Sequence, residues 1–187
     1  MAPWPDDAPE EWFRQMCEFR DRLPRAGMIA ANLYFPLLPD GAIRVQCAGG
    51  TLRDGVVDYM RGDLLPEPTP TGVTKEMLTQ VRPVDWVTFG GVLIRREVIK
   101  VCGRFDVRYT WAYFMDTDYC LEARLRGFQL VQVPCRLLHE ESRTTRREWT
   151  ENPDLTQHIT GNRALFEEKW KPFLPALPDA QQIATSQ

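Results

Sequence analysis

The chain has 187 residues, 43% of them hydrophobic, which is enough for one packed domain. A formal net charge of -3 provides no general basic field, which argues against nucleic-acid binding. No long uncharged apolar run and no basic start followed by an apolar run is present, so we expect neither a membrane span nor a standard secretory signal.

The five cysteines are widely spaced and form no C-x-x-C pair. They are Cys17, Cys47, Cys102, Cys120 and Cys135. An odd number at such spacing favours reduced thiols over a disulfide framework or a zinc ribbon. We therefore expect a cytoplasmic protein in which most cysteines are small core residues.

The first third of the chain predicts a helix and a buried strand. Apolar residues recur at helical spacing over residues 9–23, which indicates an amphipathic helix. Residues 27–34 are almost entirely apolar and are typical of a buried strand. The proline-rich stretch 54–83 has little periodicity, and we interpret it as a long surface excursion.

The middle of the chain alternates strands and helices. Residues 84–89 predict a strand, which Gly90 and Gly91 separate from a second apolar run at 92–94. A short helix is expected over 95–102, closed by the glycine that follows it.

A second helix is expected over residues 118–126, with Asp116 or Thr117 as its N-cap. Residues 128–134 predict another strand, and residues 160–170 return to helical spacing. The polar run 140–154 is expected to be irregular, and the tail 175–187 to be disordered.

Several short motifs follow one another in an order typical of one enzyme family. They are an apolar run ending in small residues, an Arg-Arg helix start, a Gly-x-Phe-Asp turn, an aromatic residue before an acidic pair, a helix ending in Arg-x-x-Gly, and a strand into Pro and then His. In this chain they are residues 86–91, Arg95 with Arg96, residues 103–106, Tyr113 and Phe114 before Asp116 and Asp118, residues 124–127, and Val133 and Pro134 before His139.

In this order the motifs resemble the acceptor half of family 2 glycosyltransferases, which transfer a sugar from a nucleotide-sugar donor to a hydroxyl acceptor. The resemblance covers most of the chain. It implies an α/β fold, a truncated GT-A-like mixed sheet flanked by helices, over residues 1–174.

The resemblance implies a role for each of the two acids. An inverting transferase removes a proton from the acceptor hydroxyl as the hydroxyl attacks the sugar, so a carboxylate must lie beside the acceptor. Asp116 is the expected catalytic base. The family pattern has Glu directly before this Asp, and here Met115 occupies that place. Asp118 is expected at the helix start or near the acceptor, and helix capping is the alternative role for both acids.

The other implied site residues lie on either side of this pair. Trp86, Gly90 and Gly91 are expected to contribute to acceptor binding, and Trp111 offers a second flat ring. A core position is the alternative for both tryptophans.

His139 follows a strand where family members place a metal ligand, which implies Mn²⁺ or Mg²⁺ on the donor diphosphate. A hydrogen-bonded structural histidine is the alternative. Arg143 and Arg146 are expected to contact the diphosphate oxygens, with a solvated basic run as the other reading.

Members of this family bind the nucleotide with an N-terminal half that carries an Asp-x-Asp motif. Only eight residues precede the first predicted helix, and Asp6 and Asp7 lack that spacing. We therefore expect weak binding of nucleotide-sugars by the chain alone, and either self-association or a protein partner. The alternative function is a non-catalytic carbohydrate- or protein-binding module derived from a glycosyltransferase.

Overall fold

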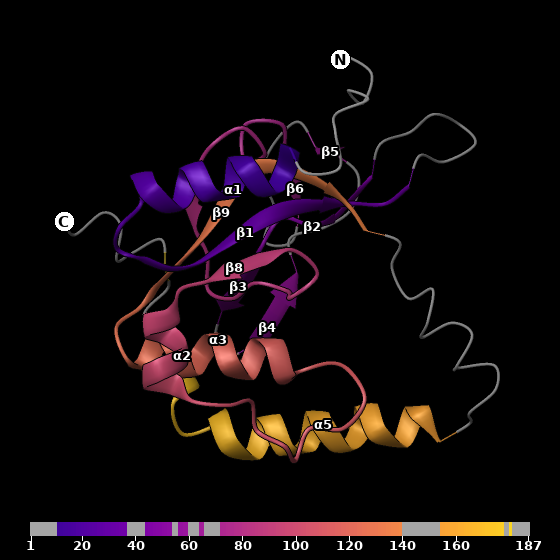
Figure 1. The fold of residues 1–187 in the computed structure, drawn as a ribbon. Coiled ribbons are helices and arrows are strands. Elements are labelled where there is room, and N and C mark those ends of the chain that lie inside the picture. Colours follow the sequence, from indigo (N-terminus) through magenta and orange to yellow (C-terminus); the bar gives the residue numbers. More distant parts are fainter. Residues whose placement is uncertain are drawn as a thin grey trace.

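The computed structural model describes residues 11–36, 44–53, 56–59, 64–65, 72–139, 154–177 and 180. Within them, a mixed sheet has helices on both faces (Figure 1). The expected fold class, a mixed α/β sheet flanked by helices, is confirmed. Among the described residues, no helix is both long and apolar enough to cross a membrane.

The strand β1 (Ala26–Tyr34) is the centre of the sheet, and all 9 of its residues are buried. One edge of β1 pairs in parallel with β9 (Gln129–Leu138) along its whole length. The other edge pairs antiparallel with β8 (Val92–Ile94) and, further along, with β2 (Val45–Cys47). Because β1 is enclosed on both edges and both faces, its sequence is apolar except for the buried Asn32, instead of alternating.

Helix α1 (Glu11–Arg22) covers one face of the sheet. Its Met16 packs with Ile29 and Ala31 of β1 and with Val133 of β9. The opposite face is covered by α2 (Arg96–Cys102) and α3 (Met115–Leu125). There Met28 and Ala30 belong to a second cluster with residues of both helices. The two sets of β1 residues alternate, as the period of 2 along a strand requires.

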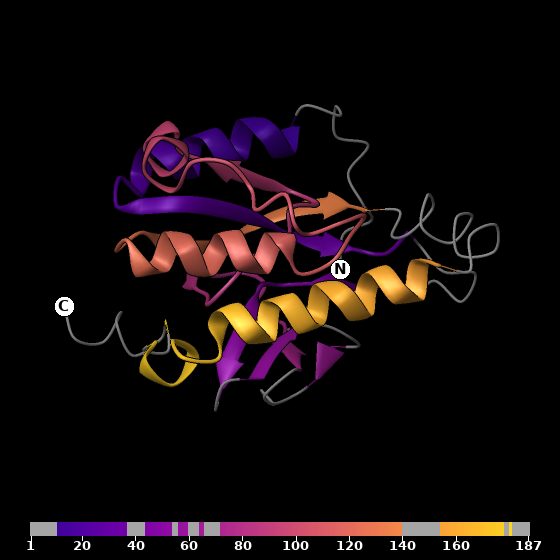
Figure 2. The same ribbon diagram turned by 90° about the horizontal axis from the view of Figure 1, so that it is seen from below.

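Helix α5 (Leu155–Trp170) lies alongside α3 and is followed by the 3-10 helix η1 (Leu174–Ala176) (Figure 2). Sequence periodicity placed the start of this helix at residue 160, five residues late. Of the tail expected to be disordered, the structure describes 175–177 and Ala180. The Ala180 N–H donates to Asp85 Oδ1 at 2.8 Å.

Two expectations for the middle of the chain are wrong. The stretch 54–83, expected to be a surface excursion, contains short strands. Strand β4 (Val56–Tyr59) pairs with β3 (Gly50–Arg53), and β5 (Leu64–Leu65) pairs with β6 (Val73–Thr74). Strand β7 (Arg82–Pro83) joins the main sheet beside β9. Residues 84–89 do not form the expected strand. They run as an irregular buried segment with one bridge between Trp86 and Gly50. The apolar residues of this segment correctly indicated that it is buried, but apolar content does not show whether a segment pairs with a neighbouring strand.

The bridge between Gly50 and Trp86 leads to a stability prediction. A Cβ on Gly50 would lie 2.0 Å from the Trp86 indole, and both residues are buried, so the packing must shift to admit it. We expect Gly50→Ala to lower the free energy of unfolding by at least about 3 kcal/mol in urea titration. Gly161→Ala is the control, because a Cβ there meets nothing within 4 Å. It should leave stability unchanged or raise it by roughly 0.5–1 kcal/mol. Equal effects of the two substitutions would contradict the close packing.

Candidate functional site

Asp116 lies in the first turn of α3, which begins at Met115, three residues earlier than expected. Neither Asp116 nor Thr117 is the N-cap. Phe114 occupies that position in a left-handed conformation (φ 67°), and no side chain caps the helix. The N-cap position predicted for Asp116 is therefore wrong, although its carboxylate accepts from an N–H of the first helical turn.

The Asp116 carboxylate is held by donors on either side of it. The Thr117 N–H donates to Asp116 Oδ1 at 2.8 Å, and the Thr88 side chain donates from the irregular segment before Gly90. Desolvation by the surrounding protein raises the pKa of Asp116 above its ordinary value of 3.8, and these hydrogen bonds oppose the rise. A carboxylate with a raised pKa is a stronger proton acceptor once it is ionised.

The segment that carries Thr88 is fixed to α3 by a buried thiol. Cys120 Sγ lies 3.4 Å from both the N–H and the carbonyl oxygen of Val87. Cys120 is fully buried, and desolvation raises the pKa of its thiol well above the ordinary range. This cysteine is therefore a neutral structural group that sets the position of Thr88 relative to Asp116.

Gly90 and Gly91 bring the same segment close to the end of β9. A Cβ on Gly90 would lie 2.9 Å from Leu33 Cδ1 and 3.5 Å from His139 Nε2. A Cβ on Gly91 would lie 2.5 Å from Leu137 Cδ2. Side chains of β1 and β9 thus lie too close to both positions for a larger residue. The predicted role of the glycines in acceptor binding stays a prediction.

His139 directly follows β9, and its N–H donates to the Tyr34 carbonyl at 2.9 Å. Its Nδ1 lies 2.8 Å from Gln46 Oε1 on β2, an acceptor that favours the tautomer with the proton on Nδ1. Nε2 is then left with a lone pair on the side toward Gly90. Metal-ligating histidines usually have such a contact from the other ring nitrogen to an oxygen, and hydrogen-bonded structural histidines have it as well, so it fits both roles considered for His139.

A single ligand does not make a metal site. Among the described residues, no group of three or more His, Cys, Asp or Glu side chains is placed to hold an ion. The described residues therefore do not by themselves fit Mn²⁺ or Mg²⁺. Asp6, Asp7, Arg143 and Arg146, the other residues considered for the diphosphate or its metal, lie outside the described residues.

Asp118 is two residues from Asp116 but lies in different surroundings. Its carboxylate accepts from Trp170 Nε1 at 2.7 Å and from the Tyr109 hydroxyl at 3.0 Å, and it pairs with Lys169 Nζ at 2.8 Å. The side chain is 5% exposed. Asp118 therefore fastens α5 to α3, and its predicted contact with the acceptor stays untested.

The two tryptophans considered for sugar binding differ in exposure. Trp86 is 1% exposed and packs in the core beside Met28 and Val84, so here it is a core residue. Trp111 is 41% exposed on the loop before α3, and Tyr113 on the same loop is 36% exposed. These two rings, and not that of Trp86, are accessible, and they precede Asp116 by five and three residues in the chain.

Sequence reasoning missed the partners that α5 supplies. Phe166, Trp170 and the buried Asn162 recur at four-residue spacing, which was a signal of one buried face. The spacing could not show that this face contacts α3 and the loop before it.

Comparison with known proteins gives distant relatives. No family profile matches the chain. An N-acetylglucosaminyl-diphospho-decaprenol L-rhamnosyltransferase of Mycobacterium tuberculosis is 31% identical over 133 residues, 68% of this chain and 41% of the relative. Uncharacterized protein y4gI of Sinorhizobium fredii is 28% identical over 162 residues, 86% of this chain and 17% of the relative. The chain thus spans less than half the length of these relatives. The similarity supports a distant, partial relationship to a glycosyltransferase.

Proposed function

We propose that this chain forms the acceptor side of a glycosyltransferase that moves a sugar from a nucleotide-sugar donor to a hydroxyl acceptor. The observation that carries the proposal is the placement of Asp116. This partly buried carboxylate has a raised pKa and lies at the start of α3, directly after a loop with two accessible aromatic rings.

In this mechanism Asp116 accepts the proton of the acceptor hydroxyl as the hydroxyl oxygen attacks the anomeric carbon, and the bond from that carbon to the nucleoside diphosphate breaks. Thr88 and the Thr117 N–H hold the carboxylate in place for that transfer. The rings of Trp111 and Tyr113 bind the acceptor sugar by its apolar face. A divalent metal would neutralise the leaving diphosphate. Because the described residues supply only His139 toward it, no step is assigned to the metal.

The relative's name suggests which substrates to test first. That protein transfers an L-rhamnosyl group, and its name specifies an N-acetylglucosaminyl-diphospho-lipid. We propose this acceptor class for the present chain as well.

The test is a transfer assay with Mn²⁺ or Mg²⁺, a panel of UDP-, GDP- and dTDP-sugars and a short-chain N-acetylglucosaminyl-diphospho-lipid. The chain is assayed alone and, if no donor is bound, with a donor-binding partner protein. Calorimetry with the same panel measures donor binding directly.

Product formation that depends on Asp116 supports the proposal. Acceptor binding without turnover under any of these conditions favours the non-catalytic binding module instead. Absence of binding to both substrates contradicts both.

The raised pKa of Asp116 predicts the pH dependence of the reaction. Only the ionised carboxylate accepts a proton, so kcat/KM should rise with pH along an acidic limb centred above the ordinary value of 3.8. The native state holds this proton to higher pH than the unfolded chain does. Asp116 should therefore lower stability as pH rises from about 3.8 through its native pKa. Rates and urea titrations across roughly pH 4 to 8 measure both effects. If the acidic limb of the kcat/KM profile persists unchanged in Asp116→Asn, the ionisation belongs to another group.

A further inference from the structure

The loop before α3 has an unusual backbone. Within the described residues, Trp111, Tyr113 and Phe114 are the non-glycine residues with positive φ, at 67°, 71° and 67°. Left-handed conformations are unfavourable for residues with a Cβ and are rare for bulky aromatic side chains. Such a backbone persists only where surrounding contacts hold it, and it is often found at binding sites.

The contacts come from one buried side chain on α5. Asn162 is 2% exposed, and its amide is directed at the backbone of this loop. Asn162 Oδ1 accepts from the Thr110 N–H at 3.0 Å. Its Nδ2 donates to the carbonyl oxygens of Thr110 at 2.7 Å, Ala112 at 2.9 Å and Tyr113 at 3.3 Å. One side chain thus contacts four backbone groups of this five-residue segment, with the two Nδ2 hydrogens shared among three carbonyl oxygens.

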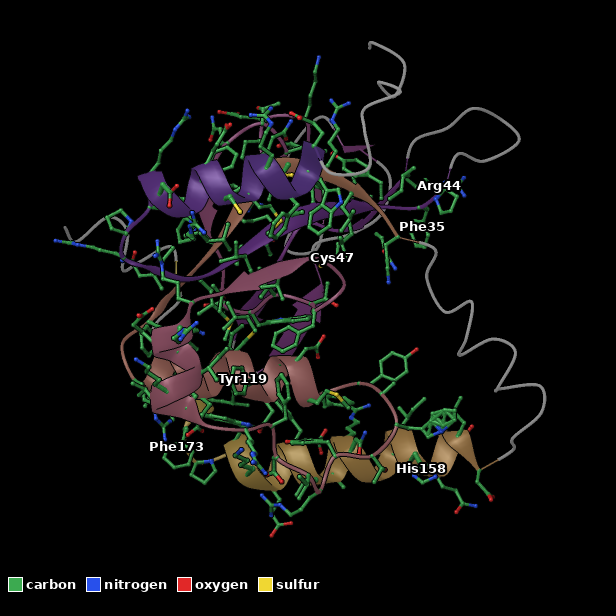
Figure 3. All side chains as sticks on the ribbon, in the orientation of Figure 1. Phe35, Arg44, Cys47, Tyr119, His158 and Phe173 are labelled. Carbon is green, nitrogen blue, oxygen red and sulfur yellow. The ribbon has the colours of Figure 1, made fainter. Side chains whose placement is uncertain are left out.

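Neighbouring residues on the same face of α5 strengthen this arrangement. His158, toward the start of α5 in Figure 3, places Nδ1 2.9 Å from the Thr110 hydroxyl. Phe166 packs against Phe114 with ring centroids 5.4 Å apart, and Trp170 donates to Asp118. With Asn162 these residues recur every four positions, so a single helical stripe holds both the loop and α3.

We propose that Asn162 is a positioning residue that holds residues 110–114 in the conformation that presents Trp111 and Tyr113 to the acceptor sugar. The acceptor part of this inference rests on the proposed function, whereas the positioning part does not. Without Asn162 the loop relaxes to ordinary backbone conformations, and only a fraction of molecules presents the two rings. The apparent affinity for the acceptor is then reduced in proportion to the fraction of molecules with the competent loop. Saturating acceptor restores that loop conformation, so KM for the acceptor rises and kcat is unchanged.

The experiment uses the chain labelled with 5-fluorotryptophan, with the Trp111 resonance assigned by Trp111→Phe. In Asn162→Ala we expect the Trp111 ¹⁹F resonance to shift or split, and the affinity for octyl N-acetylglucosaminide to fall by about tenfold. Asn162→Asp keeps the acceptor for the Thr110 N–H but loses the donor to the three carbonyl oxygens, so its Trp111 signal should change in the same direction.

Two controls separate positioning from general loss of stability. Gln157→Ala removes an exposed amide from the same helix, and Met16→Ala destabilises the core beneath α1, on the opposite face of the sheet. Neither should move the Trp111 resonance. An unchanged resonance in Asn162→Ala overturns the positioning role. A changed resonance with unaltered sugar affinity overturns the acceptor role. A wild-type chain that does not bind the glycoside contradicts the proposed acceptor class, and the resonance still decides the positioning role.

Discussion

Replacing Asp116 with asparagine is expected to reduce turnover by about 10²- to 10⁴-fold, the usual contribution of a general base. The amide keeps the size of the carboxylate and can still accept from Thr117 and Thr88, but it cannot take up the hydroxyl proton. The melting temperature should change little or rise slightly, because the substitution removes a desolvated charge. Single-turnover rates with saturating donor and acceptor measure the chemical step.

Glu122→Gln is the matched control for this variant. It makes the same chemical change on the same helix, at a residue that pairs with Arg126 at the surface. Its rate should stay within about twofold of wild type. Near-normal turnover in Asp116→Asn would end the catalytic assignment and leave the acid as a structural feature of the start of α3.

Replacing Asp118 with alanine is expected to lower the free energy of unfolding by about 3 kcal/mol, or roughly 6–12 °C in Tm. The substitution leaves Trp170 Nε1 and the Tyr109 hydroxyl without their buried acceptor and Lys169 without its counter-charge at this position. Unpaired buried donors carry the full cost of their desolvation. Urea and thermal unfolding measure the loss, and the docking of α5 should weaken first.

Glu167→Ala provides the comparison on the partner helix. Its ion pair with Arg163 is more than half exposed on both sides, so its loss should cost at most about 0.5 kcal/mol. Asp118→Asn should be intermediate, since the amide oxygen still accepts hydrogen bonds but the charge pair is lost. If Asp118→Ala unfolds at the wild-type urea concentration, the structural role given to this carboxylate is wrong.

Sequence patterns predicted most of the elements because these elements follow from local periodicity. The almost entirely apolar run at 27–34 became the central strand β1, and the helical spacing before it became α1. Glycine ended α3 as expected, since Gly127 adopts a positive φ of 83° that other residues rarely tolerate. Residues 84–89 were misassigned because burial of an irregular segment gives the same apolar signature as burial of a strand.

What the sequence alone determined is the mixed α/β class and the order of its main elements. Only the tertiary structure showed that Asp116 and Asp118 have different hydrogen-bond partners. Their spacing in the chain is two residues, yet one carboxylate lies beside Thr88 and the other binds Lys169 and Trp170, about fifty positions away. Tertiary structure also placed Trp86 in the core and left Trp111 accessible. The physical reason is that burial and hydrogen-bond partners depend on contacts between distant segments, and a local pattern carries no record of those contacts.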